Sequence, residues 1–191
     1  GMGDCTALVQ PRPVLGARFG QYTAEFEGVG SLCPAAAQRF IYVLDGELTV
    51  DAKSLVAGGY AYVPAGGAAA VSASKASRAA VFEKPYEVLA GTTPPLMFAG
   101  SESKVAPVYL NDDPALDVRA LVPDNAAFDF RVNTMTYLPG AALPAVEIHV
   151  MENGLLLLAG GGLLRPVSQW DPVPPGYFIL RTGYIHPVDG A

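Results

Sequence analysis

The stretch RFIYVLDGELTV, residues 39–50, sets Asp45-Gly46 between two short runs rich in β-branched and aromatic residues. An Asp-Gly pair in this setting is a strong hairpin signal, because both residues tolerate the positive φ angles of a tight turn. We therefore predict a β-hairpin here. The stretch NGLLLLAGGGLL, residues 153–164, has a similar layout, with three glycines in the place of Asp-Gly, and predicts a second hairpin.

A strand that begins with Gly-Tyr follows each predicted hairpin: GGYAYVPAG at 58–66 and PGYFILRTG at 175–183. The glycines of the two copies keep nearly the same offset, and the few extra residues in the second copy fit a longer loop. The glycine pairs are Gly46 and Gly160, Gly59 and Gly176, and Gly66 and Gly183. This spacing predicts an internal duplication of a β-unit, against the alternative of a chance match between two glycine-rich hairpins.

Glycine and proline, 21 and 17 residues, separate short apolar runs along the chain, which favours an all-β fold. One stretch, DPALDVRAL at 113–121, is also compatible with a short helix. The 191 residues are enough for two small domains with buried cores. We predict an N-terminal domain at 1–104, a connector rich in proline and aspartate at 105–125, and a C-terminal domain at 126–191.

The charge and cysteine content exclude several classes of protein. A net charge of −6, with no cluster of lysine and arginine, argues against a nucleic-acid binder. No apolar run reaches the length needed to span a membrane. Two cysteines, Cys5 and Cys33, do not make a disulfide framework, so a reducing compartment is expected. We expect a cytoplasmic protein that acts on a small molecule, without nucleic-acid or membrane partners.

The candidate functional residues lie in PAVEIHVMENG, residues 144–154, within one of the most apolar parts of the chain. The period of two in a strand puts Glu147, His149 and Asn153 on one face. His186 follows the Gly-Tyr strand of the same copy, and in a closed antiparallel barrel it can face the same interior. Two imidazoles, a carboxylate and an amide oxygen suit Mn²⁺, Fe²⁺, Ni²⁺ or Zn²⁺.

Two plainer interpretations compete with the metal site. A histidine on a strand is more often a hydrogen-bonded structural residue than a ligand, and this face would also suit the solvent side of an edge strand. The duplication provides a control, because the four ligand positions correspond in the first copy to Cys33, Ala35, Arg39 and Ala69. The glycines persist while every candidate ligand is replaced. This favours a functional site in the second copy and none in the first.

These residues resemble the two sequence motifs of the cupin superfamily. The first motif corresponds to Gly140, Glu147, His149, Asn153 and Gly160, and the second to Gly176, Gly183 and His186. The first copy keeps Gly58, Pro64 and Gly66 of the second motif but has Ala69 at the histidine position. Longer stretches, GELTV, GGYAYVPAG, HVMENGL and WDPVPPGYFILR, resemble the bicupin family of (S)-ureidoglycine aminohydrolases across most of the chain.

The resemblance implies an all-β fold of two tandem cupin barrels, each a double-stranded β-helix or jelly roll, the second incomplete where this sequence stops at Ala191. It also implies Mn²⁺ in the C-terminal barrel, with Glu147, His149, Asn153 and His186 as ligands. The implied reaction is hydrolysis of (S)-ureidoglycine to ureidoglycolate and ammonia, a step of purine (allantoin) breakdown. Members of the family form homo-oligomers, so self-association is expected here.

Three positions differ from the family pattern. Asn153 replaces a family histidine and His186 replaces a family glutamine, so the ligand types persist in a permuted order. Leu164 replaces a tyrosine near the substrate and offers no hydrogen bond. Two alternatives therefore stay open: another metal-dependent cupin enzyme, such as an oxygenase or isomerase, and a non-catalytic cupin that binds a small ligand or serves in assembly. The sequence identifies no general base.

Overall fold

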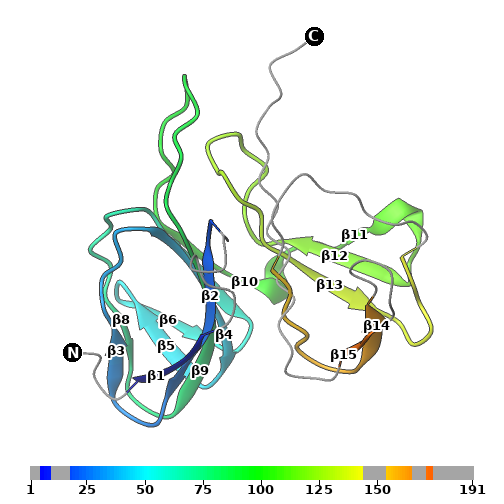
Figure 1. Ribbon diagram of the computed structural model, residues 1–191, viewed down its shortest axis with the longest axis horizontal. Coiled ribbons are helices and arrows are strands. Elements are labelled where there is room, and N and C mark those ends of the chain that lie inside the picture. The colour runs from blue at the N-terminus through cyan, green and yellow to red at the C-terminus, as the bar shows by residue number, and fades with distance from the viewer. Residues whose placement is uncertain (1–4, 10–17, 144–153, 165–170, 174–191) are drawn as a thin grey trace. The chain divides into compact units, whose positions relative to one another are not determined.

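The computed structural model describes residues 5–9, 18–143, 154–164 and 171–173 (Figure 1). Regular structure in these ranges consists of strands and two single-turn 3-10 helices, Glu102–Lys104 (η2) and Leu110–Asp112 (η3). The predicted all-β class is confirmed. None of the helices in the described ranges has the length and apolar character needed to cross a membrane.

The chain forms two compact units and enters each of them twice. Unit 1 comprises residues 1–106 and 123–129, and unit 2 comprises residues 107–122 and 130–191. We call residues 123–129 the strap, because this short segment returns from unit 2 to pack on unit 1. The predicted connector at 105–125 thus contains two strands of unit 2, given below, and the first part of the strap.

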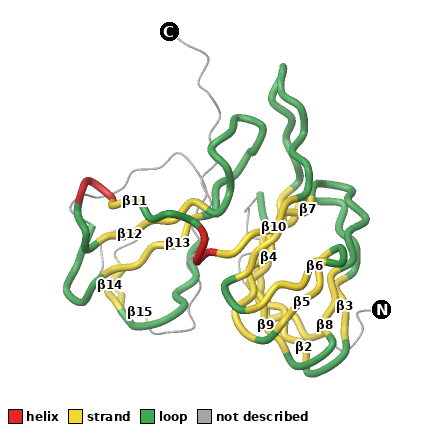
Figure 2. The backbone as a smooth tube through the Cα atoms, turned by 180° about the vertical axis from the view of Figure 1, so that it is seen from behind, coloured by secondary structure: helices red, strands yellow, loops and turns green. Residues whose placement is uncertain are grey.

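Unit 1 is built from two antiparallel sheets (Figures 1 and 2). The larger sheet has the order β1-β2-β9-β4-β7-β10, with bounds Cys5–Val9, Gly20–Phe26, Ser77–Lys84, Gln38–Asp45, Gly59–Val63 and Phe98–Ser101. The smaller sheet has the order β3-β8-β5-β6, with bounds Gly30–Leu32, Val71–Ala73, Glu47–Val50 and Lys53–Val56. Neither sheet closes on itself among the described strands.

One apolar core lies between the two sheets of unit 1, because alternate side chains of a strand point to the same face. The larger sheet contributes Ala24, Phe26, Ile41, Val43, Ala61, Val63, Ala79 and Val81, and the smaller sheet contributes Leu32, Leu48, Val50, Leu55, Val71 and Ala73. Two facing sheets with a shared core are the layer arrangement that a jelly roll requires.

The other face of the larger sheet is also buried, and it is rich in aromatic residues. The strand register sets Phe82, Phe40, Tyr62 and Phe98 in one row across four neighbouring strands. The strap covers part of this row, since the ring of Phe128 lies 5.3 Å from that of Tyr62 and 5.8 Å from that of Phe98. Both faces of β4 are therefore buried, which explains its nearly continuous apolar sequence.

The predicted hairpin at Asp45-Gly46 is wrong. Strand β4 pairs with β7 and β9, whereas β5 pairs with β6 and β8, so the turn carries the chain from one sheet to the other. Gly46 has a φ of 75°, and a Cβ there would lie 2.5 Å from Ser77 Oγ. The hairpin forms instead between β5 and β6, where Asp51 and Ala52 adopt φ angles of 47° and 65°.

Unit 2 contains two small antiparallel sheets in its described part. Val108–Tyr109 (β11), Leu116–Ala120 (β12) and Asn133–Tyr137 (β13) form one, and Gly162–Leu164 (β14) pairs with Asp171–Val173 (β15). The short helix considered at 113–121 is not formed, because β12 bonds to a neighbouring strand on each side. Tertiary pairing overrides the local helix propensity of this stretch.

The described part of unit 2 has features in common with unit 1. The antiparallel pair β12–β13 corresponds along the chain to β1–β2, and the pair β14–β15 corresponds to β5–β6. Gly160 has a φ of 78°, close to the 75° of Gly46. These features support the predicted duplication. Two complete tandem barrels stay a prediction, since part of the second copy lies outside the described residues.

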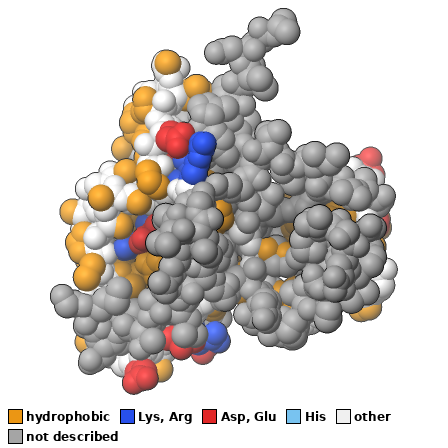
Figure 3. Space-filling model, viewed as in Figure 1, with side chains coloured by type: hydrophobic (Ala, Val, Ile, Leu, Met, Phe, Trp, Pro, Cys, Tyr) orange, Lys and Arg blue, Asp and Glu red, His pale blue; other side chains and the backbone are white. Residues whose placement is uncertain are grey.

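A long loop, residues 85–97, extends away from the sheets of unit 1 (Figures 1 and 2). Val88 is 61% exposed and Leu96 is 85% exposed, although both side chains are large and apolar. Figure 3 shows mostly apolar and uncharged atoms on this projecting part. The base of the loop is held by the strap through contacts described below.

Candidate functional site

The predicted metal ligands Glu147, His149, Asn153 and His186 lie outside the described residues. Among the residues that are described, no group of three or more His, Cys, Asp and Glu side chains is arranged to hold a metal ion. The corresponding positions of the first copy are all described, however. They show how this end of the fold is built in unit 1.

A polar cluster of Arg39, Glu83 and Tyr22 occupies one end of the inner face of unit 1. Each of the three side chains lies an even number of positions from core residues of its own strand and so shares their face. Arg39 and Glu83 are direct partners in the register of β4 and β9. Sequence parity alone therefore places a cation, an anion and a phenol at the edge of an otherwise apolar interior.

One carboxylate oxygen collects the hydrogen bonds of this cluster. Glu83 Oε1 accepts from Arg39 Nε at 2.6 Å and from Tyr22 Oη at 3.0 Å, and Arg39 Nη2 lies 2.5 Å from the same oxygen. The Arg39 side chain is 7% exposed and that of Glu83 is 26% exposed. The guanidinium is thus largely withdrawn from water, whereas the carboxylate remains accessible on one side.

One other position that corresponds to a proposed ligand, Cys33, contacts this cluster directly. Arg39 Nη2 also donates to the backbone carbonyl of Cys33 at 3.0 Å. Ala69 packs against the apolar core, and the loop that precedes it is tied to the loop before β4 by a bond of 3.1 Å from Gly66 N–H to the Ala36 carbonyl. In unit 1, therefore, the positions of both motifs meet at one end of the sheets.

Unit 1 does not provide the chemistry of a divalent metal site at these positions. Arg39 carries five N–H donors and no acceptor, and Ala35 and Ala69 have no donor atoms in their side chains. Glu83 was missed by the sequence analysis. Its signal is present in the sequence, since a charged residue two positions after Val81 and four after Ala79 shares the face of two core residues.

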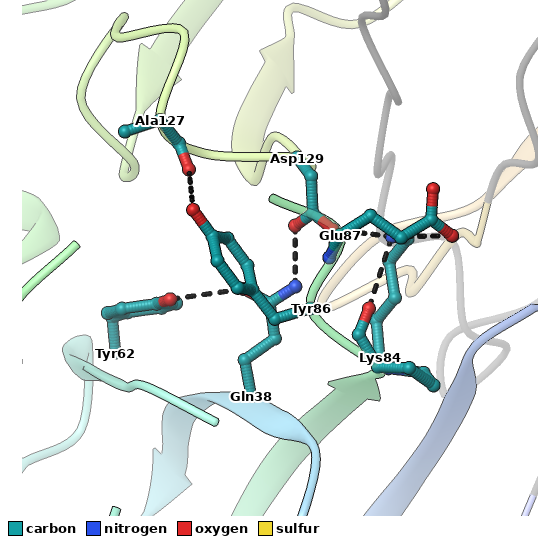
Figure 4. A network of polar contacts seen from close by, with 8 residues as sticks. Gln38, Tyr62, Lys84, Tyr86, Glu87, Ala127 and Asp129 are labelled. Atoms are coloured by element: carbon teal, nitrogen blue, oxygen red, sulfur yellow. Dashed lines mark hydrogen bonds and ion pairs between the residues drawn. The ribbon is translucent and has the colours of Figure 1, made fainter. Parts of the chain in front are cut away.

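A second polar network lies on the outer, aromatic face of unit 1 and is centred on Asp129 of the strap (Figure 4). Asp129 Oδ1 accepts from Gln38 Nε2 at 2.5 Å, and Oδ2 accepts from Lys84 Nζ at 2.6 Å and from the backbone N–H of Glu87 at 2.8 Å. Asp129 and Lys84 are 7% and 5% exposed. A buried ion pair of this kind depends on each charge keeping its partner.

Two tyrosines extend the network of Asp129. Tyr62 Oη donates to Gln38 Oε1 at 3.1 Å, and Tyr86 Oη donates to the Ala127 carbonyl at 3.0 Å (Figure 4). Burial raises the pKa of both phenols, and the negative charge of Asp129 raises the pKa of each further. Both phenols are therefore held in the neutral, donating form. The bonds join the strap to the base of the 85–97 loop, so this network is an anchor.

Comparisons with known proteins agree with the fold and with the sequence resemblance. No family model matches the chain. The chain is 30% identical over 180 residues to the (S)-ureidoglycine aminohydrolase of Arabidopsis thaliana, a match that covers 91% of this chain and 60% of that protein. It is 26% identical over 197 residues to the (S)-ureidoglycine aminohydrolase of Escherichia coli, covering 96% of this chain and 74% of that protein.

Solved structures give the same picture at the level of the backbone. The crystal structure of protein Ylba from E. coli has a TM-score of 0.79 at 25% identity, over 96% of this chain and 79% of that chain. A cupin 2 conserved barrel domain protein from Leptotrichia buccalis has a TM-score of 0.58 at 13% identity, over 94% and 78%. The structural similarities support a cupin fold, and the sequence similarity is to proteins named (S)-ureidoglycine aminohydrolase. The chain spans about 60% of the length of its Arabidopsis relative.

Proposed function

We propose that the protein is a metal-dependent hydrolase of the (S)-ureidoglycine aminohydrolase type, which releases ammonia from a small ureido amino acid in purine catabolism. The observation that carries the proposal is the similarity to proteins of this name from a plant and a bacterium, over more than nine-tenths of this chain in each case. The proposal includes a cytoplasmic location and self-association. Light scattering on the purified protein would test the self-association.

The proposed metal ligands are Glu147, His149, Asn153 and His186, and the proposed metal is Mn²⁺, with Fe²⁺, Ni²⁺ or Zn²⁺ as alternatives. This set of nitrogen and oxygen donors fits such an ion by its chemistry, since it provides neutral imidazoles with a carboxylate and lacks thiolates. Further support comes from unit 1, where the corresponding positions of both motifs meet at one end of the sheets.

The proposed reaction breaks the C–N bond to the amino group and forms a C–O bond from water, without oxidation or reduction. When bound, the metal would supply a positive charge that orients the substrate and stabilises developing negative charge. Glu147 would lower the net charge of the site, and the apolar residues around it would limit access of water. Leu164 cannot donate a hydrogen bond, so other side chains must orient the ureido group.

A pair of carboxylate variants tests the proposal. Glu147→Gln removes a proposed ligand, whereas Glu152→Gln changes a neighbour of opposite strand parity that is expected to point away from the ligands. We expect Glu147→Gln to lose bound Mn²⁺ and at least 100-fold in ammonia release from (S)-ureidoglycine, the order of loss on removing a group that orients or stabilises the transition state. Glu152→Gln should retain both properties.

Three results would contradict parts of this proposal. Equal metal content in both variants would exclude Glu147 as a ligand. A wild-type protein that binds Mn²⁺ but releases no ammonia from (S)-ureidoglycine would exclude the substrate. Turnover that requires Fe²⁺ and O₂ would indicate the oxygenase alternative, for which two histidines and a carboxylate are also a suitable ligand set.

A further inference from the structure

The cluster of Arg39, Glu83 and Tyr22 has the composition of a cation site in which the cation is part of the chain. The guanidinium lies on the inner face of unit 1 and donates to a carboxylate oxygen of Glu83 and to the backbone carbonyl oxygen of Cys33. The phenol of Tyr22 bonds to the same carboxylate oxygen at 3.0 Å. Two oxygen atoms thus accept from the guanidinium, and the Tyr22 hydroxyl supports one of them.

The predicted duplication relates the position of this charge to the proposed metal site. Arg39 corresponds to Asn153, and Cys33 corresponds to Glu147, so guanidinium and carbonyl stand where the second copy has two of its proposed ligands. A partly buried carboxylate at the edge of an apolar interior, such as that of Glu83, needs a nearby cation, since removing a charge from water without a partner is costly. A metal ion and a guanidinium both meet this need, but a guanidinium needs no uptake from solution.

We infer that Arg39 is a built-in cation that takes, in unit 1, the place a metal ion takes in the second copy. The inference rests on the predicted duplication. Its comparison of the guanidinium with a metal ion also rests on the metal site given under Proposed function. The guanidinium of Arg39 therefore excludes divalent ions from this position in unit 1. Removal of the guanidinium leaves an anionic site, made by Glu83, Tyr22 and the Cys33 carbonyl, that accepts a small planar cation from solution.

An exposed ion pair on the same sheet provides a matched control. Arg78 Nε lies 3.1 Å from Glu25 Oε1, but their side chains are 53% and 35% exposed. Truncation of Arg78 opens no enclosed site, because solvent already reaches both groups. The comparison separates a cation site from the general effect of adding a guanidinium salt to a protein.

The experiment is chemical rescue of Arg39→Ala with ethylguanidinium, measured as the thermal midpoint in the presence of EDTA. We expect Arg39→Ala to lower the Tm by roughly 5–10 °C, because the partly buried carboxylate of Glu83 loses its partner and the guanidinium leaves a gap. Ethylguanidinium at about ten times its Kd should restore roughly 3–5 °C of this loss. Arg78→Ala and the wild type should show neither the loss nor the recovery.

Several outcomes would overturn the inference: an Arg39→Ala Tm equal to that of the wild type, no recovery with ethylguanidinium, or the same recovery in Arg78→Ala. Because EDTA is present, none of these depends on metal in the second copy. If Arg39→Ala is too unstable to purify, the double variant Arg39→Met/Glu83→Gln tests the inference through its ability to fold, since it removes both charges together. This double variant should fold; its failure to fold would contradict a site defined by charge balance.

Discussion

At the scale of single residues, Gly46 and Gly66 form a natural pair for measuring backbone constraint. Both adopt positive φ angles, 75° and 68°, but a Cβ at Gly46 would meet Ser77 Oγ at 2.5 Å and the Ala76 carbonyl at 2.6 Å, whereas a Cβ at Gly66 would have nothing within 4 Å. Gly66→Ala should cost about 1–2 kcal/mol from the left-handed conformation alone. Gly46→Ala should cost roughly 2 kcal/mol more, because backbone must move.

Chemical denaturation of the two alanine variants measures this difference directly. The turn at Gly46 joins the two sheets of unit 1, and Ser77 Oγ binds the backbone of Glu47 there. A Gly46→Ala variant no less stable than Gly66→Ala would show that the contact with Ser77 does not constrain the turn.

The buried tyrosines predict how stability changes at alkaline pH. Burial raises the pKa of Tyr42, and the hydrogen bond to Glu102 and the negative charge of Glu102 raise it further. Burial also raises the pKa of Tyr62, and the negative charge of Asp129 adds to that shift. A folded-state pKa above the ordinary value of about 10 means that the neutral phenol stabilises the fold. This contribution is complete below about pH 10 and is lost as the pH rises from there towards the folded-state pKa.

Denaturation at a series of alkaline pH values should therefore show a flatter decline for Tyr42→Phe than for the wild type. The variant should also lose about 1 kcal/mol near neutral pH, because Glu102 loses its donor. Tyr109→Phe, at a tyrosine that is 51% exposed, is the control and should follow the wild type. Identical pH curves for Tyr42→Phe and the wild type would contradict the assignment.

Residue patterns allow part of the cluster at Arg39 to be predicted and hide the rest. The two-residue period is enough to put Arg39 and Glu83 on the core face, and the predicted duplication sets Arg39 opposite Asn153, a proposed ligand. Their pairing depends on the register of β4 with β9, strands that are separated by more than thirty residues. No local pattern encodes that register.

At the scale of elements, the strap depends on one carboxylate. Asp129→Asn keeps the size of the side chain but removes the negative charge 2.6 Å from the ammonium of Lys84, which is 5% exposed, and leaves it the Glu87 carboxylate at 3.7 Å. We expect a loss of roughly 3 kcal/mol in the free energy of unfolding. Hydrogen exchange should also accelerate at the Glu87 amide, which donates to Asp129 Oδ2.

The control for the strap is Asp45→Asn, at an exposed aspartate of unit 1, which should change stability by less than about 0.5 kcal/mol. A loss at Asp129 no larger than at Asp45 would mean that the network in Figure 4 does not hold the strap. Local exchange data distinguish detachment of the strap from general loosening of unit 1, because only the former leaves β4 protected.

Strands were more predictable than their partners. The runs at 39–45 and 47–50 form β4 and β5 as expected, but the two strands join different sheets. A turn signal such as Asp-Gly reports the backbone conformation of two residues, and that conformation serves a hairpin and a corner between sheets equally well. Likewise β12 forms because it pairs with β11 and β13, and the sequence of β12 itself does not reveal these partners.

At the scale of the whole molecule, removal of metal should affect the two units differently. The proposed ligands belong to unit 2, whereas the charge balance of unit 1 is internal. Chelation with EDTA should therefore lower hydrogen-exchange protection in β13 of unit 2 and leave β4 and β9 of unit 1 unchanged. Equal loss in both units, or no change in unit 2, would contradict a metal site confined to the second copy.

The path of the chain has a consequence for modularity. Duplicated halves are usually thought of as separable modules, each of which could be expressed, shuffled or lost without the other. Here unit 1 needs Phe128 and Asp129, which are translated only after two strands of its neighbour. A ribosome must therefore make part of unit 2 before unit 1 can finish folding, and a gene cut at the apparent boundary would leave the first half without its last side chains.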